Sequence, residues 1–180
     1  PNYLAALADS MRPYLAQGFD HLLLSYHGLP ERHLRKADPT GAHCLASGDC
    51  CERASAAHAT CYRAHCSYVS RELAARLELA PEQCSMAFQS RLGRDKWIEP
   101  YTENRIDELA AQGVKRLLVA CPAFVADCIE TLEEINEEIR ESFEEAGGEA
   151  FTYIPCLNDD DAHIAALSAI VETNLRGWLD

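Results

Sequence analysis

The chain has 180 residues, 48% of them hydrophobic, and a formal net charge of −13 at pH 7. This size and apolar content suffice for one compact domain with a substantial core. The acidic charge argues against a nucleic-acid partner, because such proteins carry a basic surface for the phosphate backbone. No apolar run approaches the roughly 20 residues of a transmembrane segment, and the first residues lack the order of a secretory signal. We therefore expect a soluble, cytoplasmic protein.

Four apolar runs rich in Leu, Val, Ile or aromatic residues predict strands over residues 20–26, 84–88, 115–120 and 150–154. The amphipathic stretches around them predict helices over residues 2–17, 62–78, 101–112, 128–146 and 160–178. Strands that alternate with helices favour parallel pairing through right-handed crossovers. The sequence therefore predicts an α/β fold of three layers, Rossmann-like, with a four-stranded parallel sheet flanked by helices. We expect one domain over residues 1–180.

His27 lies in the segment "LLLSYHGLP", at the end of a predicted buried strand. Gly28 and Pro30 let the backbone turn away without covering the imidazole. Ligands gather at the carboxyl ends of strands in parallel sheets, although a single histidine there is more often structural. The pattern alone leaves both interpretations open.

The segment from 37 to 60 fits neither a helical nor a strand pattern and predicts a long loop. It belongs to a cysteine-rich segment, at about 37–66, which contains Cys44, Cys50, Cys51, Cys61 and Cys66. Such crowding favours a metal or a cluster over disulfides, and the odd total of nine cysteines cannot all pair. Unligated thiols in a surface loop are the alternative. Small apolar filling is the expected role of the other four, Cys84, Cys121, Cys128 and Cys156.

The predicted helix over 128–146 is strongly acidic, with nine acidic residues between 127 and 145 and one basic residue, Arg140. Asp127 and Glu130 have the D-x-x-E spacing of a capping box, which by itself explains both carboxylates. Helical spacing predicts one apolar face, formed by Ile129, Leu132, Ile135, Ile139 and Phe143. It predicts an acidic row on the opposite side, formed by Glu130, Glu134 and Glu138. This row suits a solvated surface, but a passing divalent cation would also offset its charge repulsion.

Four motifs occur in order: "SYHGLP", "FQSRLGRDKWIEPYT", "PAFVADCIETLEEI" and "GGEAFTYIPCLND". In this order and spacing they resemble the carboxyl-terminal half of the ferrochelatase family, over nearly the whole chain. Members of that family have two similar α/β halves with the active cleft between them. The resemblance implies a carboxyl-terminal chelatase-like domain whose amino-terminal partner half is absent from this sequence. It also implies insertion of Fe²⁺ into protoporphyrin IX to form heme.

By this resemblance His27 is a proton acceptor or an iron ligand, and Glu130 is the active glutamate. Glu134 and Glu138 resemble a path that delivers iron. A porphyrin is a flat apolar disc with carboxylates at one rim, so its cleft should offer aromatic faces and a cationic or hydroxyl edge. The candidates for the faces are Tyr26, Trp97 and Phe124, each of which also suits an ordinary core. The candidates for the edge are Ser90 and Arg91, although an arginine beside a turn is often simply solvated.

Some bacterial members of the family carry a [2Fe-2S] cluster, and the cysteine-rich segment resembles theirs. The resemblance implies the ligands Cys44, Cys50, Cys51 and Cys61, with Cys66 as the substitute; zinc is the alternative metal. Two other functions stay open, namely an iron-sulfur or metal-binding sensor module without chelatase activity and a chelatase for another tetrapyrrole such as coproporphyrin. The expected partners are porphyrin, ferrous iron and the amino-terminal half. We expect no nucleic acid and no transmembrane segment, and leave a peripheral membrane contact open.

Overall fold

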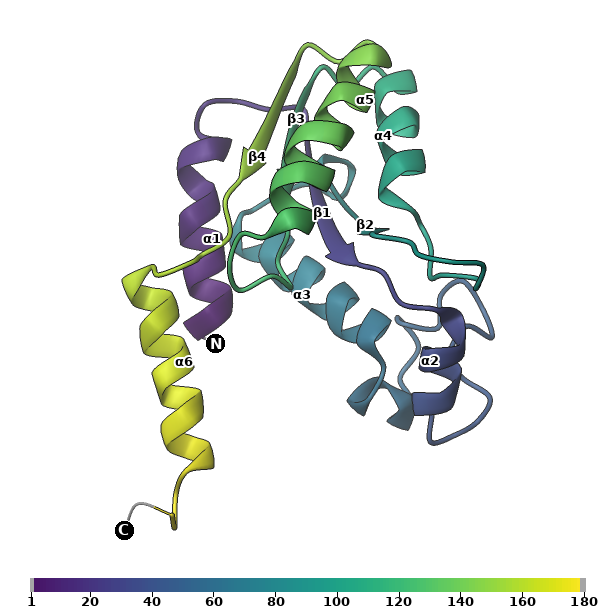
Figure 1. Ribbon diagram of the computed structural model, residues 1–180, viewed down its shortest axis with the longest axis vertical. Helices are drawn as coiled ribbons and strands as arrows, with labels where there is room; N and C mark the ends of the chain where they lie inside the picture. The colour runs from purple at the N-terminus through teal and green to yellow at the C-terminus, as the bar shows by residue number, and fades with distance from the viewer. Residues whose placement is uncertain (1, 179–180) are drawn as a thin grey trace.

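A four-stranded, all-parallel sheet in the order β2-β1-β3-β4 forms the centre of the protein (Figure 1). The computed structural model describes residues 2–178. Each strand lies within one residue of its predicted range: β1 (His21–His27), β2 (Cys84–Gln89), β3 (Arg116–Ala120) and β4 (Ala150–Ile154). The predicted parallel α/β fold is therefore confirmed.

Helices cover both faces of the sheet, as a three-layer fold requires. One face carries α1 (Asn2–Leu15) and α3 (Tyr62–Arg76). The other carries α4 (Thr102–Ala111), the π-helix η3 (Glu130–Ile139) and α5 (Arg140–Glu145). Three further elements were not predicted from the sequence: α2 (Glu31–Ala37) and the short 3₁₀ helices η1 (Ala56–Ala59) and η2 (Pro81–Gln83).

Alternate residues of β1 pack into two separate cores. Leu22 and Leu24 pack with α1 and α3, whereas Leu23 packs with α4 and η3, and all three are 0% exposed. Successive side chains of a strand point to opposite faces of the sheet. Burial on both faces explains why β1 is an unbroken apolar run, as is usual for an inner strand of a parallel sheet.

The predicted α-helix over 128–146 is wrong in type, because residues 130–139 form the π-helix η3 before α5 begins. A π-helix bonds residue i to i+5, so its turns contain more residues than those of an α-helix. The predicted apolar face is therefore split: Ile135 and Phe143 are buried, but Ile129 and Leu132 are 62% and 45% exposed. The buried line runs at four-residue spacing instead and consists of Thr131, Ile135, Ile139 and Phe143.

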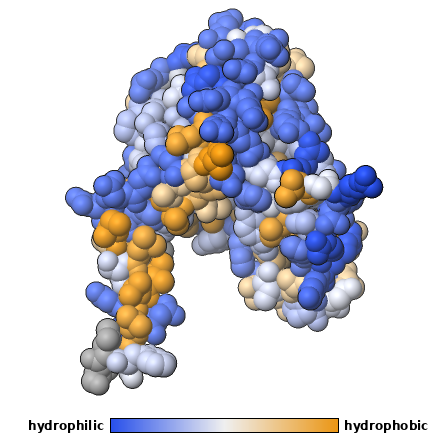
Figure 2. Space-filling view, viewed as in Figure 1, coloured by the Kyte–Doolittle hydropathy of each residue, from blue (hydrophilic) through white to orange (hydrophobic). Residues whose placement is uncertain are grey.

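The last helix, α6 (Asp161–Asn174), extends from the body of the protein beside α1 (Figure 1). His163 and Ala166, near its start, are buried. Figure 2 shows an apolar stripe along the rest of the helix, which includes the exposed residues Ile164, Leu167, Ile170 and Val171. None of the described helices has the length and apolar composition needed to cross a membrane.

Gly148 lies between α5 and β4, directly against the ring of Phe143. A Cβ atom at this position would lie 2.2 Å from Cε1 of Phe143, which is itself fully buried. We expect Gly148→Ala to lower the free energy of unfolding by about 1 to 3 kcal/mol, the usual cost of overpacking a core. Urea unfolding measures this loss. Gly48→Ala is the matched control, because a Cβ there meets no atom within 4 Å; equal losses in both variants would contradict the packing argument.

Candidate active site

His27 is the last residue of β1 and lies half-buried at the carboxyl edge of the sheet. Its Nδ1 lies 2.7 Å from the carbonyl oxygen of Gly28. A carbonyl oxygen can only accept, so Nδ1 carries the hydrogen and Nε2 is the basic nitrogen of the neutral ring. The rings of Trp97 and Phe124 lie near the imidazole, with centroids 6.3 and 6.4 Å from it.

Gly28 allows the turn after β1 to approach the end of β2 closely. Its N–H donates to the carbonyl oxygen of Gln89 at 2.8 Å. A Cβ on Gly28 would lie 3.0 Å from that oxygen and 3.2 Å from Cε3 of Trp97. The glycine therefore allows Trp97 to pack beside His27.

Glu130 is the first residue of η3 and follows β3 through an irregular segment. Its pKa is lowered chiefly by a hydrogen bond with Cys128, with help from its own backbone, and further by the charge of His27. In the register of β1 and β2, His27 pairs with Gln89, and Nε2 of Gln89 donates to the backbone oxygen of Glu130 at 2.7 Å. His27 and Glu130 therefore lie at the same edge, where the carboxyl ends of parallel strands meet.

Gln89 joins the strands to the first turn of η3, although sequence analysis does not identify it. It is 3% exposed at the end of β2, and its Nε2 donates to the backbone oxygen of Glu130 at 2.7 Å. Its Oε1 accepts from the hydroxyl of Ser25 at 2.7 Å. A polar residue that ends a buried strand needs such partners, and this was the available signal.

The capping-box interpretation of Asp127 and Glu130 is wrong, since no side chain caps the start of η3. The carboxylate of Asp127 instead accepts from Tyr153 Oη at 2.6 Å, from the N–H of Cys156 at 3.1 Å and from Asn158 Nδ2 at 2.8 Å. Burial alone would raise the pKa of Asp127, but these hydrogen bonds lower it below its usual value. Asp127 thus ties the segment before η3 to the loop after β4.

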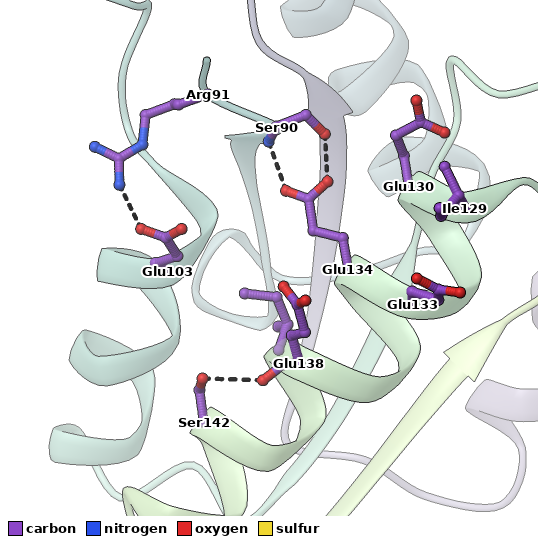
Figure 3. Close-up of a pocket in the computed structure, with 10 residues that line it drawn as sticks. Ser90, Arg91, Glu103, Ile129, Glu130, Glu133, Glu134, Glu138 and Ser142 are labelled. Atoms are coloured by element: carbon purple, nitrogen blue, oxygen red, sulfur yellow. Dashed lines mark hydrogen bonds and ion pairs between the residues drawn. The ribbon is translucent and has the colours of Figure 1, made fainter. Parts of the chain in front are cut away.

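A cavity of about 530 Å³ lies between η3 and the segment after β2 (Figure 3). Its wall carries the carboxylates of Glu103, Glu130, Glu133, Glu134 and Glu138. A solvated position opposite the core was one expectation for Glu134. The structure differs, because the carboxylate of Glu134 accepts from the N–H of Ser90 at 2.6 Å and from the Ser90 hydroxyl. Arg91 pairs with Glu103, and its guanidinium lies 4.1 Å from the ring centroid of Tyr101.

The residues predicted to contact a porphyrin fall into three places. Trp97 and Phe124 lie half-buried beside His27. Ser90 and Arg91 line the cavity of carboxylates. Tyr26 is only 1% exposed, and its hydroxyl lies 2.8 Å from Ser70 Oγ on α3, inside the core.

The five cysteines of the cysteine-rich segment lie together, four of them buried and Cys51 half-buried. Burial and contact with the Cys61 thiol raise the pKa of Cys44 to about 12. Burial, opposed by Arg63 and reinforced by the Cys50 thiol, raises the pKa of Cys51 to about 11. Cys44, Cys61 and Cys66 belong to one buried cluster, and Cys51 packs against it.

Positive charge and hydrogen-bond donors surround the Cys50–Cys51 pair. Nη1 of Arg63 lies 3.7 Å from Sγ of Cys50 and 3.8 Å from Sγ of Cys51. Nε2 of His43 and of His58 lie 2.8 and 2.9 Å from the carbonyl oxygen of Cys50. Within residues 2–178, no three His, Cys, Asp or Glu side chains are arranged to hold a metal ion, so a site for a single ion is not preformed.

Comparison with known proteins agrees with the resemblance of the four motifs. The family model described as Ferrochelatase matches residues 1–175. The chain is 65% identical over 173 residues to a ferrochelatase of Ectopseudomonas mendocina (strain ymp), which covers 96% of this chain and 51% of that relative. It is 63% identical over 168 residues to a ferrochelatase of Stutzerimonas stutzeri (strain A1501), and this match covers 93% of this chain and 49% of that relative. The chain thus spans about half the length of the curated relatives it matches.

Asp127→Asn tests the link between η3 and the loop after β4. The folded pKa of Asp127 is lower than its ordinary value of 3.8, so the carboxylate stabilises the fold above that pH. This contribution is lost as pH falls through the folded pKa. We expect the variant to lose about 1 to 2 kcal/mol of unfolding free energy at pH 7, and the loss to shrink below about pH 4.

Urea unfolding at pH 7 and at pH 3 measures both values. Asp159→Asn is the control, because Asp159 is exposed and makes no side-chain hydrogen bond within the described part of the chain. A deficit in Asp127→Asn that is the same at both pH values would argue against the charged hydrogen bonds.

Proposed function

The chain belongs to the ferrochelatase family, and we propose that the full-length protein inserts Fe²⁺ into protoporphyrin IX to form heme. The activity is assigned to the full-length protein because this chain spans about half of its relatives, and the amino-terminal half would supply the opposite wall of the cleft. The observation that carries the proposal is the position of His27 and Glu130 at one edge of the sheet, joined through Gln89, with Trp97 and Phe124 beside the imidazole.

Metallation requires two pyrrole N–H protons to leave while a desolvated Fe²⁺ enters the ring. We propose that Nε2 of His27 takes up a proton or binds the metal, since Nδ1 is engaged with Gly28. The ionised Glu130 attracts the cation to the same place. A histidine and a carboxylate therefore divide the handling of protons and metal between them.

For the porphyrin, we assign Trp97 and Phe124 to its apolar faces, because both flank the imidazole. Tyr26 would support this surface from within the core. Ser90 and Arg91 are assigned to the propionate edge. To bind propionates they must exchange their present bonds to Glu134 and Glu103.

For the metal, we assign Glu130, Glu134 and Glu138 to its path, because all three line the cavity shown in Figure 3. They follow one another at four-residue spacing along η3. A row of carboxylates suits a hydrated divalent cation, which prefers oxygen ligands while it keeps its water. The cavity would then lead the ion along η3 toward Glu130.

For the cysteine-rich segment, we propose a [2Fe-2S] cluster held by Cys44, Cys50, Cys51 and Cys61. Four cysteines that lie together in one segment suit a cluster of two irons that takes four thiolates. Cys66, the substitute ligand, lies on α3 and is buried. When bound, such a cluster supplies one-electron chemistry and cross-links the loop.

A sensor module without chelatase activity would have no need for His27 beside Glu130 and Trp97, and the relatives named above are ferrochelatases. A different tetrapyrrole, such as coproporphyrin, remains compatible with the same residues. Parallel assays with protoporphyrin IX and coproporphyrin distinguish the two substrates.

His27→Ala and Glu130→Gln test the proposed chemistry in the full-length protein. We expect each to lower kcat for zinc insertion into protoporphyrin IX by about 100-fold, the usual contribution of a general acid or base. Porphyrin fluorescence follows the reaction. Glu137→Gln is the control, because Glu137 is exposed on the same helix but does not line the cavity. Full activity in His27→Ala would exclude the imidazole as the proton acceptor.

The absorption spectrum of the full-length protein, purified without oxygen, tests the cluster. We expect visible absorption of an iron-sulfur cluster in the wild type and in Cys66→Ser, and its loss in Cys50→Ser. The two variants remove thiols that are similarly buried, 3% exposed each, so they differ in ligation rather than in burial. A colourless wild-type protein that contains one zinc ion per chain would show that the cysteines bind zinc and not an iron-sulfur cluster.

A further inference from the structure

Tyr62 connects the cysteine-rich segment to the end of β1. It directly follows Cys61 and is the first residue of α3. Its hydroxyl donates to the backbone oxygen of His27 at 2.9 Å. Cys66 follows four residues later on the same helix and is 3% exposed. Tyr62 therefore links the start of α3, within the cysteine-rich segment, to the strand that carries His27.

The hydrogen bond from Tyr62 is one of two that hold the peptide unit between His27 and Gly28. The carbonyl of His27 and the N–H of Gly28 belong to the same planar group. Its N–H donates to the carbonyl oxygen of Gln89 at 2.8 Å, and its C=O accepts from Tyr62. These two hydrogen bonds hold the peptide plane between His27 and Gly28, and so fix the Cα atoms at both of its ends. The carbonyl oxygen of Gly28, the next along the chain, accepts from Nδ1 of the imidazole.

The position of Tyr62 depends in turn on Cys61. Cys61 is the N-cap residue of α3 and is 3% exposed, and it belongs to the same buried cluster as Cys44. The backbone on either side is held by the bond from Cys61 N–H to Ala57 O at 2.9 Å and by the bond from Thr60 Oγ1 to Ala37 O at 2.7 Å. Ligation of Cys61 and Cys44 by one group would lock the residue next to Tyr62 in place.

We propose that Tyr62 is a positioning residue that couples the ligation of the cysteine cluster to the orientation of His27. A ligated Cys61 holds the first turn of α3, which holds the Tyr62 hydroxyl against the His27 carbonyl. When the thiols are not ligated, the hydroxyl moves more freely and the peptide between His27 and Gly28 keeps only its bond to Gln89. The cluster therefore acts on metal insertion through the backbone, without contact with the porphyrin. This proposal rests on the proposed roles of His27 and of the cluster.

Tyr62→Phe in the full-length protein removes the hydroxyl and keeps the ring. We expect the visible absorption of the cluster to remain and kcat for metal insertion to fall about 10-fold, which corresponds to one hydrogen bond. The KM for porphyrin should not change, because Tyr62 does not touch the substrate. Tyr68→Phe, on the same helix, is the control: Tyr68 is 51% exposed and should tolerate the change without loss. If Tyr62→Phe lost the cluster absorption, its effect could not be assigned to His27 and the proposal would be overturned.

A double-mutant cycle with Cys50→Ser tests the coupling itself. The thiol of Cys50 lies beside Arg63, and no hydrogen bond joins Cys50 to Tyr62 among the described residues, so its removal should reach His27 only through the loss of the cluster. We expect Cys50→Ser to lower kcat in the wild type and to have almost no further effect in Tyr62→Phe. Effects that multiply independently would overturn the coupling. A wild type that binds neither a cluster nor zinc would overturn it as well.

Hydrogen-deuterium exchange of the peptide that contains residues 24–29 gives a readout that does not depend on activity. Tyr62→Phe and Cys50→Ser should each speed exchange at the end of β1 by about 3- to 10-fold, and the double variant should exchange no faster. Residues 150–154 of β4 serve as the internal reference. If the wild type inserts no metal, the proposed function fails, whereas unchanged exchange in an active enzyme rejects only the role of Tyr62.

Discussion

The parallel register between β1 and β2 is the constraint on which the site depends. His27 pairs with Gln89 in this register, so the peptide after His27 meets the Gln89 carbonyl and the Gln89 side chain reaches the carbonyl of Glu130. A slip by one residue would turn every side chain of the strand to the other face of the sheet. The imidazole would then leave the edge, and the buried amide of Gln89 would lose its partners. Burial of Leu22, Leu23 and Leu24 on both faces excludes such a slip.

The acidic wall of the cavity is stable because its carboxylates have different partners. Like charges four residues apart on a helix cost a few tenths of a kcal/mol per pair. Two hydrogen bonds from Ser90 stabilise the carboxylate of Glu134, and Arg91 balances the charge of Glu103. Glu130 and Glu138 remain exposed to the cavity. Each glutamate of this row directly precedes a residue of the buried line, so the row lies beside that line rather than opposite it. π-helical turns are frequent at functional sites.

The sequence predicts the sheet well because burial on both faces leaves an unbroken apolar run, as in β1. It does not predict the π-helix, since residues at four-residue spacing share a face in either kind of helix and only the backbone bonds differ. Asp127 illustrates a second limit of prediction from sequence. The D-x-x-E spacing is compatible with a helix cap, but the carboxylate of Asp127 accepts hydrogen bonds from Tyr153 and Asn158 instead. Gln89 and Tyr62 act through backbone atoms distant in sequence, so no local pattern reveals them.

The cysteine-rich segment lies beside a positive charge, Arg63, that has no ion-pair partner among the described residues. Arg63 forms no ion pair within residues 2–178, and its buried Nε has no hydrogen-bond partner there. Its neighbour Cys51 is neutral at pH 7, because burial raises the pKa of this thiol to about 11. Arg63 is half-buried, and the thiolates of the proposed cluster would supply negative charge beside its guanidinium. In the proposed coupling, the bond from Tyr62 to His27 would carry the effect of ligation to the end of β1.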